Sequence, residues 1–466
     1  MKFRTIISTL VAVAVVGVVG AYAATVAFGN MGGDAHAQLS AADQALVARG
    51  AYVATLGDCA ACHTAAHGQP FAGGLPISTP IGTVYTTNIT PDQATGIGQY
   101  TLGNFERAVR RGVRPDGSSL YPAMPYPSYA HVSDEDIRAL YVYFMHGVKP
   151  VSAHDLAPGI PWPLSMRWPL TYWRWMFAPA VSPALQPTVG PAAASNGANA
   201  TANGAPNDAA ILDRGRYLVE GLAHCGTCHT ARGAGLQEKA LTDADGVDYL
   251  AGGMVDHHVA NNLRGDDMTG LGRWSKADIV EFLRTGRNSE TAAFGGMQDV
   301  VVHSTQHMTD ADLDAIASYL KSLSAGSHSA SHFAYQSAAA TALASGNVSM
   351  PGSLDYLNSC AACHLSSGKG YIGTFPVLAG NPVVNAPSPN SLVNIVLNGS
   401  TETSSSTVPT QFAMPPFGDR LTDDEVAHIV TFIRKSWGND APAVDAAQVA
   451  KIRAQTHAAA TPTRSQ

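Results

Sequence analysis

Three stretches of the chain share one pattern of apolar and polar positions. Each starts with Ser or Thr, continues with acidic residues, and then places apolar residues at the i, i+3, i+4, i+7 spacing of one helix face. A hydroxyl residue followed by Asp or Glu three positions later is typical of a capped helix start. The pattern predicts three amphipathic helices that each pack one face on a core. They are Ser133 with Ile137, Leu140, Tyr141 and Phe144; Thr309 with Leu313, Ile316, Ala317 and Leu320; and Thr422 with Val426, Ile429, Val430 and Ile433.

Other segments repeat in the first two thirds of the chain. Residues 95–98 (Thr-Gly-Ile-Gly) match residues 269–272 (Thr-Gly-Leu-Gly), and an Arg-Gly pair opens a similar run at Arg49 and Arg214. Repeats of this kind indicate that one structural unit recurs. At about 150 residues per domain, a chain of 466 residues fits three such units.

The N-terminus has the form of an export signal. Lys2 and Arg4 precede an apolar run over residues 6–28, and Ala35-His36-Ala37 follows as a small-residue cleavage site. We predict a signal peptide over residues 1–37, with an uncleaved membrane anchor as the alternative. Either way we expect the rest of the chain to lie outside the cytoplasm.

Composition separates the predicted domains from the predicted linkers and tail. Residues 186–209 and 324–350 are rich in Ala, Ser, Asn and Gly and are predicted to be linkers, and residues 441–466 are predicted to be a flexible tail. The predicted domains are therefore residues 38–185, 210–323 and 351–440.

The first predicted domain ends in a tryptophan-rich arm, residues 161–177. It holds four of the six tryptophans, and its prolines are incompatible with a regular transmembrane helix. Three roles stay open: packing on a neighbouring domain, docking to a partner subunit, and a position among lipid headgroups.

The net charge argues against one class of partner. The formal net charge is −7, which argues against nucleic acid as a partner. Charged residues make up only 14% of the chain, while Gly and Pro are plentiful. This composition suits a protein whose loops wrap a bulky apolar cofactor.

All six cysteines lie in three Cys-x-x-Cys-His stretches. Two thiols three positions apart can bond covalently to a haem, and the histidine can ligate its iron, so the pattern predicts three covalently bound haems c. Three disulfides, redox dithiols or zinc sites are the alternatives. None of them explains a histidine after the second cysteine in every case. The stretches are Cys59, Cys62 and His63; Cys225, Cys228 and His229; and Cys360, Cys363 and His364.

The second axial ligand decides between electron transfer and chemistry at the iron. Methionine favours reduced iron and suits a carrier. Met124 and Met414 lie in Pro-rich segments, 9 and 8 residues before the helix starts at Ser133 and Thr422. A lone methionine usually fills a gap in a core, but the repeated position favours ligation.

The second unit offers more candidates. Met297 lies 12 residues before Thr309 and is the preferred ligand, because a ligand needs loop length to reach across the ring. Met308, His303 and His307 stay as alternatives.

The chain contains no dinucleotide fingerprint, nucleophile elbow or Walker loop. We therefore expect no substrate-oxidising site in the chain and a function of one-electron transfer. A haem enzyme with an open iron, such as a peroxidase, is the alternative from another class, and a freestanding soluble carrier is a second.

The sequence resembles the triple-haem cytochrome c subunit of membrane-bound quinoprotein alcohol dehydrogenase from acetic acid bacteria. The resemblance covers nearly the whole mature chain. Besides the three haem stretches it rests on residues 67–70 (His-Gly-Gln-Pro), 87–90 (Thr-Asn-Ile-Thr), 121–127, 144–147 (Phe-Met-His-Gly), 162–169 and 380–384 (Gly-Asn-Pro-Val-Val).

The resemblance implies an all-α fold of three tandem class I cytochrome c-like domains, loop-rich and each wrapped around one covalently bound haem. It implies a partner subunit that carries pyrroloquinoline quinone (PQQ) and its own haem, with or without a further small subunit. Ubiquinone is the implied electron acceptor, and the implied membrane association is peripheral. Related triple-haem subunits serve aldehyde, gluconate, sorbitol and fructose dehydrogenases, so the oxidised substrate stays open.

Overall fold

The computed structural model describes residues 44–181, 208–326 and 332–460. The predicted signal peptide and residues 186–207 of the first predicted linker lie outside these ranges. The chain divides into two compact units, the first comprising Met1–Pro187 with Glu220–His224 and the second Thr188–Val219 with Cys225–Gln466. The first unit holds one Cys-x-x-Cys-His stretch and the second unit holds the other two.

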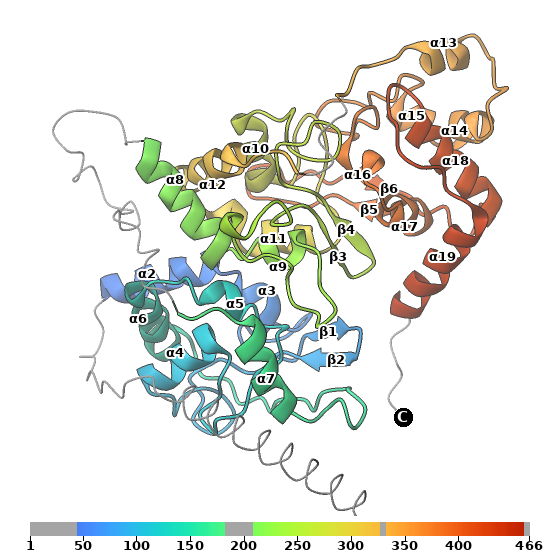
Figure 1. Ribbon diagram of the computed structural model, residues 1–466. Helices are drawn as coiled ribbons and strands as arrows, with labels where there is room; N and C mark the ends of the chain where they lie inside the picture. The colour runs from blue at the N-terminus through green and yellow to red at the C-terminus, as the bar shows by residue number, and fades with distance from the viewer. Residues whose placement is uncertain (1–43, 182–207, 327–331, 461–466) are drawn as a thin grey trace, which may run out of the picture. The chain divides into compact units, whose positions relative to one another are not determined.

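The first unit is built on a packed pair of helices, α2 and α6 (Figure 1). They come close because Gly50 of α2 lies against the backbone of Ala139 in α6, where a Cβ would be 2.0 Å from the carbonyl oxygen. The elements of this unit are α2 (Gln44–Leu56), α3 (Cys59–His63), β1 (Pro76–Thr79), β2 (Gly82–Tyr85), α4 (Leu102–Arg111), α5 (Tyr126–Tyr129), α6 (Asp134–Val142), the π-helix η1 (Tyr143–Gly147) and α7 (Trp168–Phe177).

The second unit begins with a region organised in the same way, in which α8 packs on α12. Gly215 of α8 lies against Ala315 of α12 just as Gly50 does against Ala139. The elements of this region are α8 (Asp208–Arg216), the π-helix η3 (Tyr217–Leu222, part of which groups with the first unit), α9 (Gly226–His229), η4 (Asp243–Asp245), β3 (Gly253–Val255), β4 (His258–Ala260), α10 (Lys276–Thr285), α11 (Gly296–His303), η5 (Thr305–His307) and α12 (Asp310–Ser322).

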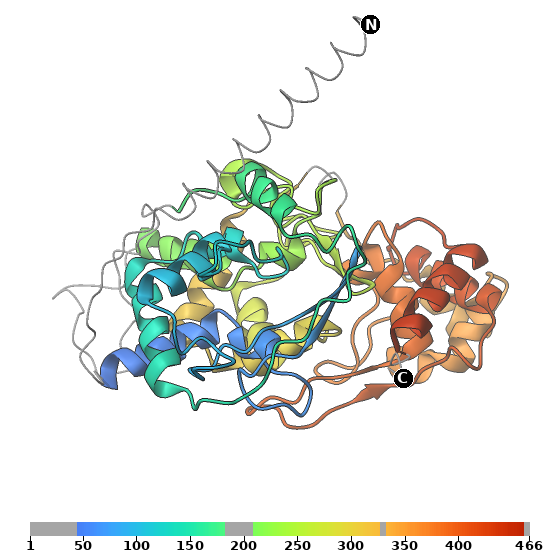
Figure 2. The same cartoon turned by 90° about the horizontal axis from the view of Figure 1, so that it is seen from below.

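A third region completes the second unit. Its core gathers around Tyr356, Phe432 and Trp437, whose ring centroids lie 5.3 to 5.6 Å apart. Figure 2, like Figure 1, shows α18 and α19 side by side. The elements are α13 (Ala338–Ala344), α14 (Ser353–Ser359), α15 (Ala361–His364), α16 (Pro382–Asn385), α17 (Asn390–Asn398), β5 (Ser400–Thr401), β6 (Ala413–Met414), α18 (Asp423–Lys435) and α19 (Ala446–Ala460).

The three predicted helix starts are confirmed. Ser133, Thr309 and Thr422 are the N-caps of α6, α12 and α18, and each hydroxyl accepts a hydrogen bond from the backbone N–H three residues on. The predicted apolar residues are buried, apart from Tyr141, which is half-buried. Because caps and periodicity are local signals, the sequence could predict these helices well.

The strands among the described residues form only three two-stranded antiparallel pairs: β1 with β2, β3 with β4, and β5 with β6. In the two-residue turn between β3 and β4, Asp256 and His257 both have positive φ (46° and 64°), as in a type I′ hairpin turn. The fold is thus mostly helical and loop-rich, consistent with the predicted all-α cytochrome c-like class.

Two predictions about irregular segments are wrong. Residues 446–460 of the predicted flexible tail form α19, and its Val449 and Ile452 are buried in the third core. Part of the predicted linker 324–350 forms α13, and its Leu343 joins the same core. Composition pointed to loops because both segments are Ala-rich, but a few apolar residues are enough to dock them.

Candidate haem sites

Each Cys-x-x-Cys-His stretch forms a short helical turn. The first coincides with α3, and Cys225 and Cys360 are the N-cap residues of α9 and α15. Residues three positions apart lie on one side of a helix, so each turn presents two thiols together with the next histidine. No disulfide joins any of the six cysteines.

The surroundings of the thiols argue against redox or zinc chemistry. Burial raises the pKa of Cys59, Cys225 and Cys360 to about 12, whereas reactive dithiols and thiolate ligands have lowered pKa values. Among the residues that the structure describes, no three His, Cys, Asp or Glu side chains gather where they could hold a metal ion. A structural zinc site needs four such ligands and a catalytic one needs three.

The three histidines make the same hydrogen bond. Nδ1 lies 2.7 Å from the Thr87 carbonyl oxygen in His63, 2.6 Å from that of Asn261 in His229, and 2.9 Å from that of Pro376 in His364. Since a carbonyl only accepts, Nδ1 carries the proton and Nε2 is left with its lone pair for an iron. These partners could not be found from the sequence, because a backbone carbonyl leaves no residue signature.

Burial also lowers the pKa of each of these histidines. Each imidazole is therefore held neutral, which is the form that ligates a metal.

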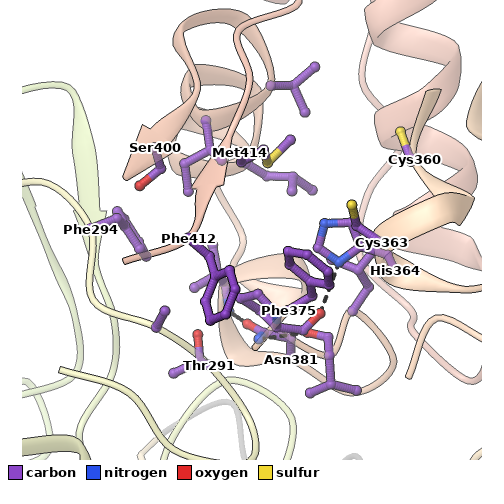
Figure 3. Close-up of a pocket in the computed structure, with 18 of the residues that line it drawn as sticks. Thr291, Phe294, Cys360, Cys363, His364, Phe375, Asn381, Ser400, Phe412 and Met414 are labelled. Atoms are coloured by element: carbon purple, nitrogen blue, oxygen red, sulfur yellow. Dashed lines mark hydrogen bonds between the residues drawn. The ribbon is translucent and has the colours of Figure 1, made fainter. Parts of the chain in front are cut away.

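The third region contains an apolar cavity lined by the third Cys-x-x-Cys-His stretch (Figure 3). Cys360, Cys363, His364 and the predicted ligand Met414 all line it, although Met414 lies 50 residues from the histidine. Met414 belongs to β6, whose pairing with β5 places it at this wall. The structure thus brings the whole predicted set for the third haem into one cavity; the other lining residues include Phe294, Phe375, Val383, Val384, Leu392, Val396, Phe412 and Phe417.

The other two predicted methionines are half-buried. Met124 lies just before α5, where its carbonyl accepts a hydrogen bond from the Tyr126 N–H at 2.8 Å. Met297 is the second residue of α11 and does not lie in a loop as expected. Both remain predictions as iron ligands.

The alternatives in the second region differ in exposure. Met308 is buried in the core at 4% exposure, and His303 and His307 are exposed. The His307 ring lies 3.1 Å from the Val302 carbonyl oxygen of its own segment. This distribution favours Met297, which is neither fully buried in the core nor exposed on the surface.

Comparisons with known proteins agree with this chemistry. The family described as "Cytochrome c" matches residues 212–324, and the family described as "Cytochrome C oxidase, cbb3-type, subunit III" matches residues 350–433. Both matched ranges contain one Cys-x-x-Cys-His stretch, so haem attachment is supported for these two regions.

Three relatives match over most of their length. The chain is 52% identical to the cytochrome c subunit of alcohol dehydrogenase (quinone) from Gluconacetobacter polyoxogenes, over 92% of this chain and 88% of the relative. It is 52% identical to the gluconate 2-dehydrogenase cytochrome c subunit of Pantoea cypripedii, over 88% and 90%. It is 37% identical to the fructose dehydrogenase cytochrome subunit of Gluconobacter japonicus, over 88% and 82%.

Proposed function

Since the chain belongs to the family of dehydrogenase cytochrome c subunits, whose role is electron transfer, we propose that it is the electron-transfer subunit of an alcohol dehydrogenase (quinone) complex. In this proposal a separate subunit with PQQ oxidises the alcohol, and the chain conducts the electrons to ubiquinone. The observation that carries the proposal is the 52% identity over 92% of the chain.

Three covalently bound haems c are part of this proposal. A haem iron supplies a one-electron couple whose potential follows its axial ligands, hydrogen bonds and burial. The chain's contribution is to tether the ring, to orient one imidazole by a carbonyl, and to exclude water. The residues proposed for these tasks are Cys59, Cys62, His63 and Met124; Cys225, Cys228, His229 and Met297; and Cys360, Cys363, His364 and Met414.

A gluconate dehydrogenase complex is the second candidate. The gluconate relative is as similar as the alcohol relatives, at 52% identity. Because the oxidised substrate binds to the partner subunit, residues of the cytochrome chain do not distinguish the two.

Peripheral attachment to the periplasmic face of the membrane is also proposed, and the tryptophan-rich arm supports it. No helix in the described ranges is both long and apolar enough to cross a bilayer. The inner side of α7 is fixed to the first unit, where Arg174 donates to the Ser119 hydroxyl at 3.0 Å. Trp162 and Trp175 are 80% and 72% exposed, and exposed tryptophans suit a headgroup region.

Substrate-dependent reduction of the purified complex tests the proposal. The chain is tagged and purified from detergent-solubilised membranes with its partners, and the haem spectrum is recorded after addition of ethanol or gluconate. Reduction by ethanol and not by gluconate is expected, and the reverse result would establish the second candidate. A lone soluble chain that no dehydrogenase subunit accompanies would contradict both.

A second measurement addresses the peroxidase alternative. Methionine on ferric haem gives an absorption band at the red end of the visible spectrum, and an open iron does not. Binding of peroxide to one iron, with the band present for only two, would contradict the electron-transfer assignment for that site.

A further inference from the structure

The cavity of the third region has one wall that belongs to the second. Residues 291–294, between α10 and α11, line this cavity together with His364 and Met414. Figure 3 shows Thr291 and Phe294 facing the cavity from this neighbouring segment. The third site is therefore incomplete without the second region.

The same segment leads directly to the second predicted haem site. Phe294 is three residues before Met297, the predicted ligand of the second iron. Asn381, which lines the cavity, donates from its side chain to the Glu290 carbonyl oxygen at 3.2 Å. A short run of backbone thus joins the two sites and is hydrogen-bonded to the cavity wall.

A buried ion pair crosses the boundary at this place. Nη1 of Arg287 lies 2.5 Å from Oε2 of Glu402, and their side chains are only 6% and 11% exposed. The guanidinium also donates to the Thr410 carbonyl oxygen and lies 5.8 Å from the centre of the Phe412 ring. Glu402 and Phe412 both line the cavity.

The two charges act strongly on each other, because burial leaves little water to screen either of them. Burial raises the pKa of Glu402, and the positive charge of Arg287 opposes that shift. Arginine stays protonated in proteins, so Arg287 is a permanent charge at the edge of this cavity. Removing one partner of such a pair leaves the other uncompensated in a medium of low dielectric constant.

We propose that Glu402 of the third region cancels the effect of the Arg287 charge on the reduction potential of the third haem, so that this potential depends on a charge balance between the two regions. The inference rests on the proposed occupancy of the third site. A positive charge near a haem favours the reduced iron, which carries one positive charge fewer, and so raises the potential. The intact pair cancels to first order, and loss of one member shifts the potential in a known direction.

The test is a redox titration of the full complex with three variants. Glu402→Gln leaves the guanidinium uncompensated, and we expect the potential of one haem of this chain to rise while those of its other two haems and of the partner's haem stay in place. In the double variant with Arg287→Gln both charges are gone, so the shifted potential should return toward the wild-type value. Arg284→Gln, which removes a half-buried arginine paired with the exposed Asp310 in the same region, should move none of them.

Two further measurements show which haem has the shifted potential and whether each site is occupied. Replacing Cys360 and Cys363 by Ser should remove the potential that moved in Glu402→Gln. Haem content is measured in the wild type and in the charge variants, where fewer than three haems c bound to this chain would contradict the proposed occupancy. Three haems with unchanged potentials in Glu402→Gln would overturn the inference and leave the proposed function intact.

Discussion

The helix pairs beside the three Cys-x-x-Cys-His stretches all cross at a glycine, but they are held together in different ways. The first two glycines lie inside helices, whereas the third is the N-cap of α14 with a φ of +78°. A Cβ on any of them would lie 2.0 to 2.2 Å from a carbonyl oxygen of the partner helix. The close pairs are Gly50 with Ala139, Gly215 with Ala315, and Gly352 with His428.

The acidic residue at the third helical position has a different partner in the third region. In α6 and α12 it is Asp136 and Asp312, which bind Arg49 and Arg214 on the facing helix. In α18 it is Glu425, which accepts from the backbone N–H and hydroxyl of Thr422 and closes a capping box. One position of the repeat thus holds two helices together in two regions and caps a single helix in the third.

The third region gains its cohesion from apolar contacts instead. α19 covers α18 through Val449 and Ile452, and Arg453 of α19 pairs with Asp423 at 2.8 Å. A buried ion pair fixes geometry with strict partners, while an apolar face tolerates changes of similar volume. The comparison shows that the same helix arrangement can be stabilised by a buried ion pair or by apolar packing.

The largest expected effect comes from adding a side chain at the glycine where two helices cross. Gly215→Val would push a branched side chain into the carbonyl of Ala315, and backbone on both sides leaves no room to yield. We expect a loss of more than about 4 kcal/mol in the free energy of unfolding, measured by urea denaturation together with haem incorporation. Asp213→Val, at an exposed position of the same helix, controls for the helix propensity of valine.

Next in size is the buried ion pair of the second region. Arg214 and Asp312 form two hydrogen bonds of 2.8 and 2.9 Å with side chains only 10% and 7% exposed. Asp312→Ala would remove the carboxylate that compensates the charge of this buried guanidinium, at a cost of about 3 kcal/mol in the free energy of unfolding. Asp310→Ala, at an exposed position of the same helix, is the control.

The first region should respond less to the equivalent change. Arg49 is 25% exposed and also pairs with Glu135 at 3.1 Å, so Asp136→Ala leaves it another partner and water. Equal losses in Asp136→Ala and Asp312→Ala would mean that burial does not set the strength of this contact.

The helix starts and haem stretches could be predicted because their signals are local. Thr309 and Thr422 mark α12 and α18 by residue type and spacing alone. The pair between Asp312 and Arg214 joins residues 98 positions apart, and no pattern near either residue indicates it. The capping-box sequence instead suggests Thr309 as the partner of Asp312.

The third candidate site was predictable only in part. Its cysteines and histidine follow from the pentapeptide, and Met414 from its distance to the next helix. The wall at Phe294 and the charge of Arg287 come from another region, so tertiary packing alone places them at the cavity. The docking of α19 was missed because only Val449 and Ile452 of an Ala-rich segment carry it.

A smaller effect is expected from the apolar docking of the third region. Ile452 is 3% exposed in the third core, so Ile452→Ala should cost about 2 kcal/mol in the free energy of unfolding. Lys451→Ala, one position away on the exposed side, should change little. A flexible tail would make both substitutions neutral, and thermal unfolding of the two variants decides between these cases.

The smallest effect is expected at the caps. Thr422→Ala removes the hydroxyl that accepts from the Glu425 N–H and should cost about 1 kcal/mol. Thr309→Ala should cost a similar amount, because its hydroxyl accepts from the Asp312 N–H in the same way. Thermal unfolding at neutral pH measures both.

Acid tests the cap of α18, in which the third carboxylate closes a capping box with Thr422. Hydrogen bonds from the backbone N–H and the hydroxyl of Thr422 lower the pKa of Glu425 in the folded chain. A carboxyl with a lowered folded pKa stabilises the fold above its unfolded pKa, and this contribution is lost as the pH falls through the folded pKa. The difference in stability between wild type and Glu425→Gln should therefore be present at neutral pH and vanish below the ordinary range of a glutamate. A difference that stays constant down to that pH would mean that the ionised carboxylate has no part in the cap, and the contrast between α18 and the other two helices would then rest on the arginines alone.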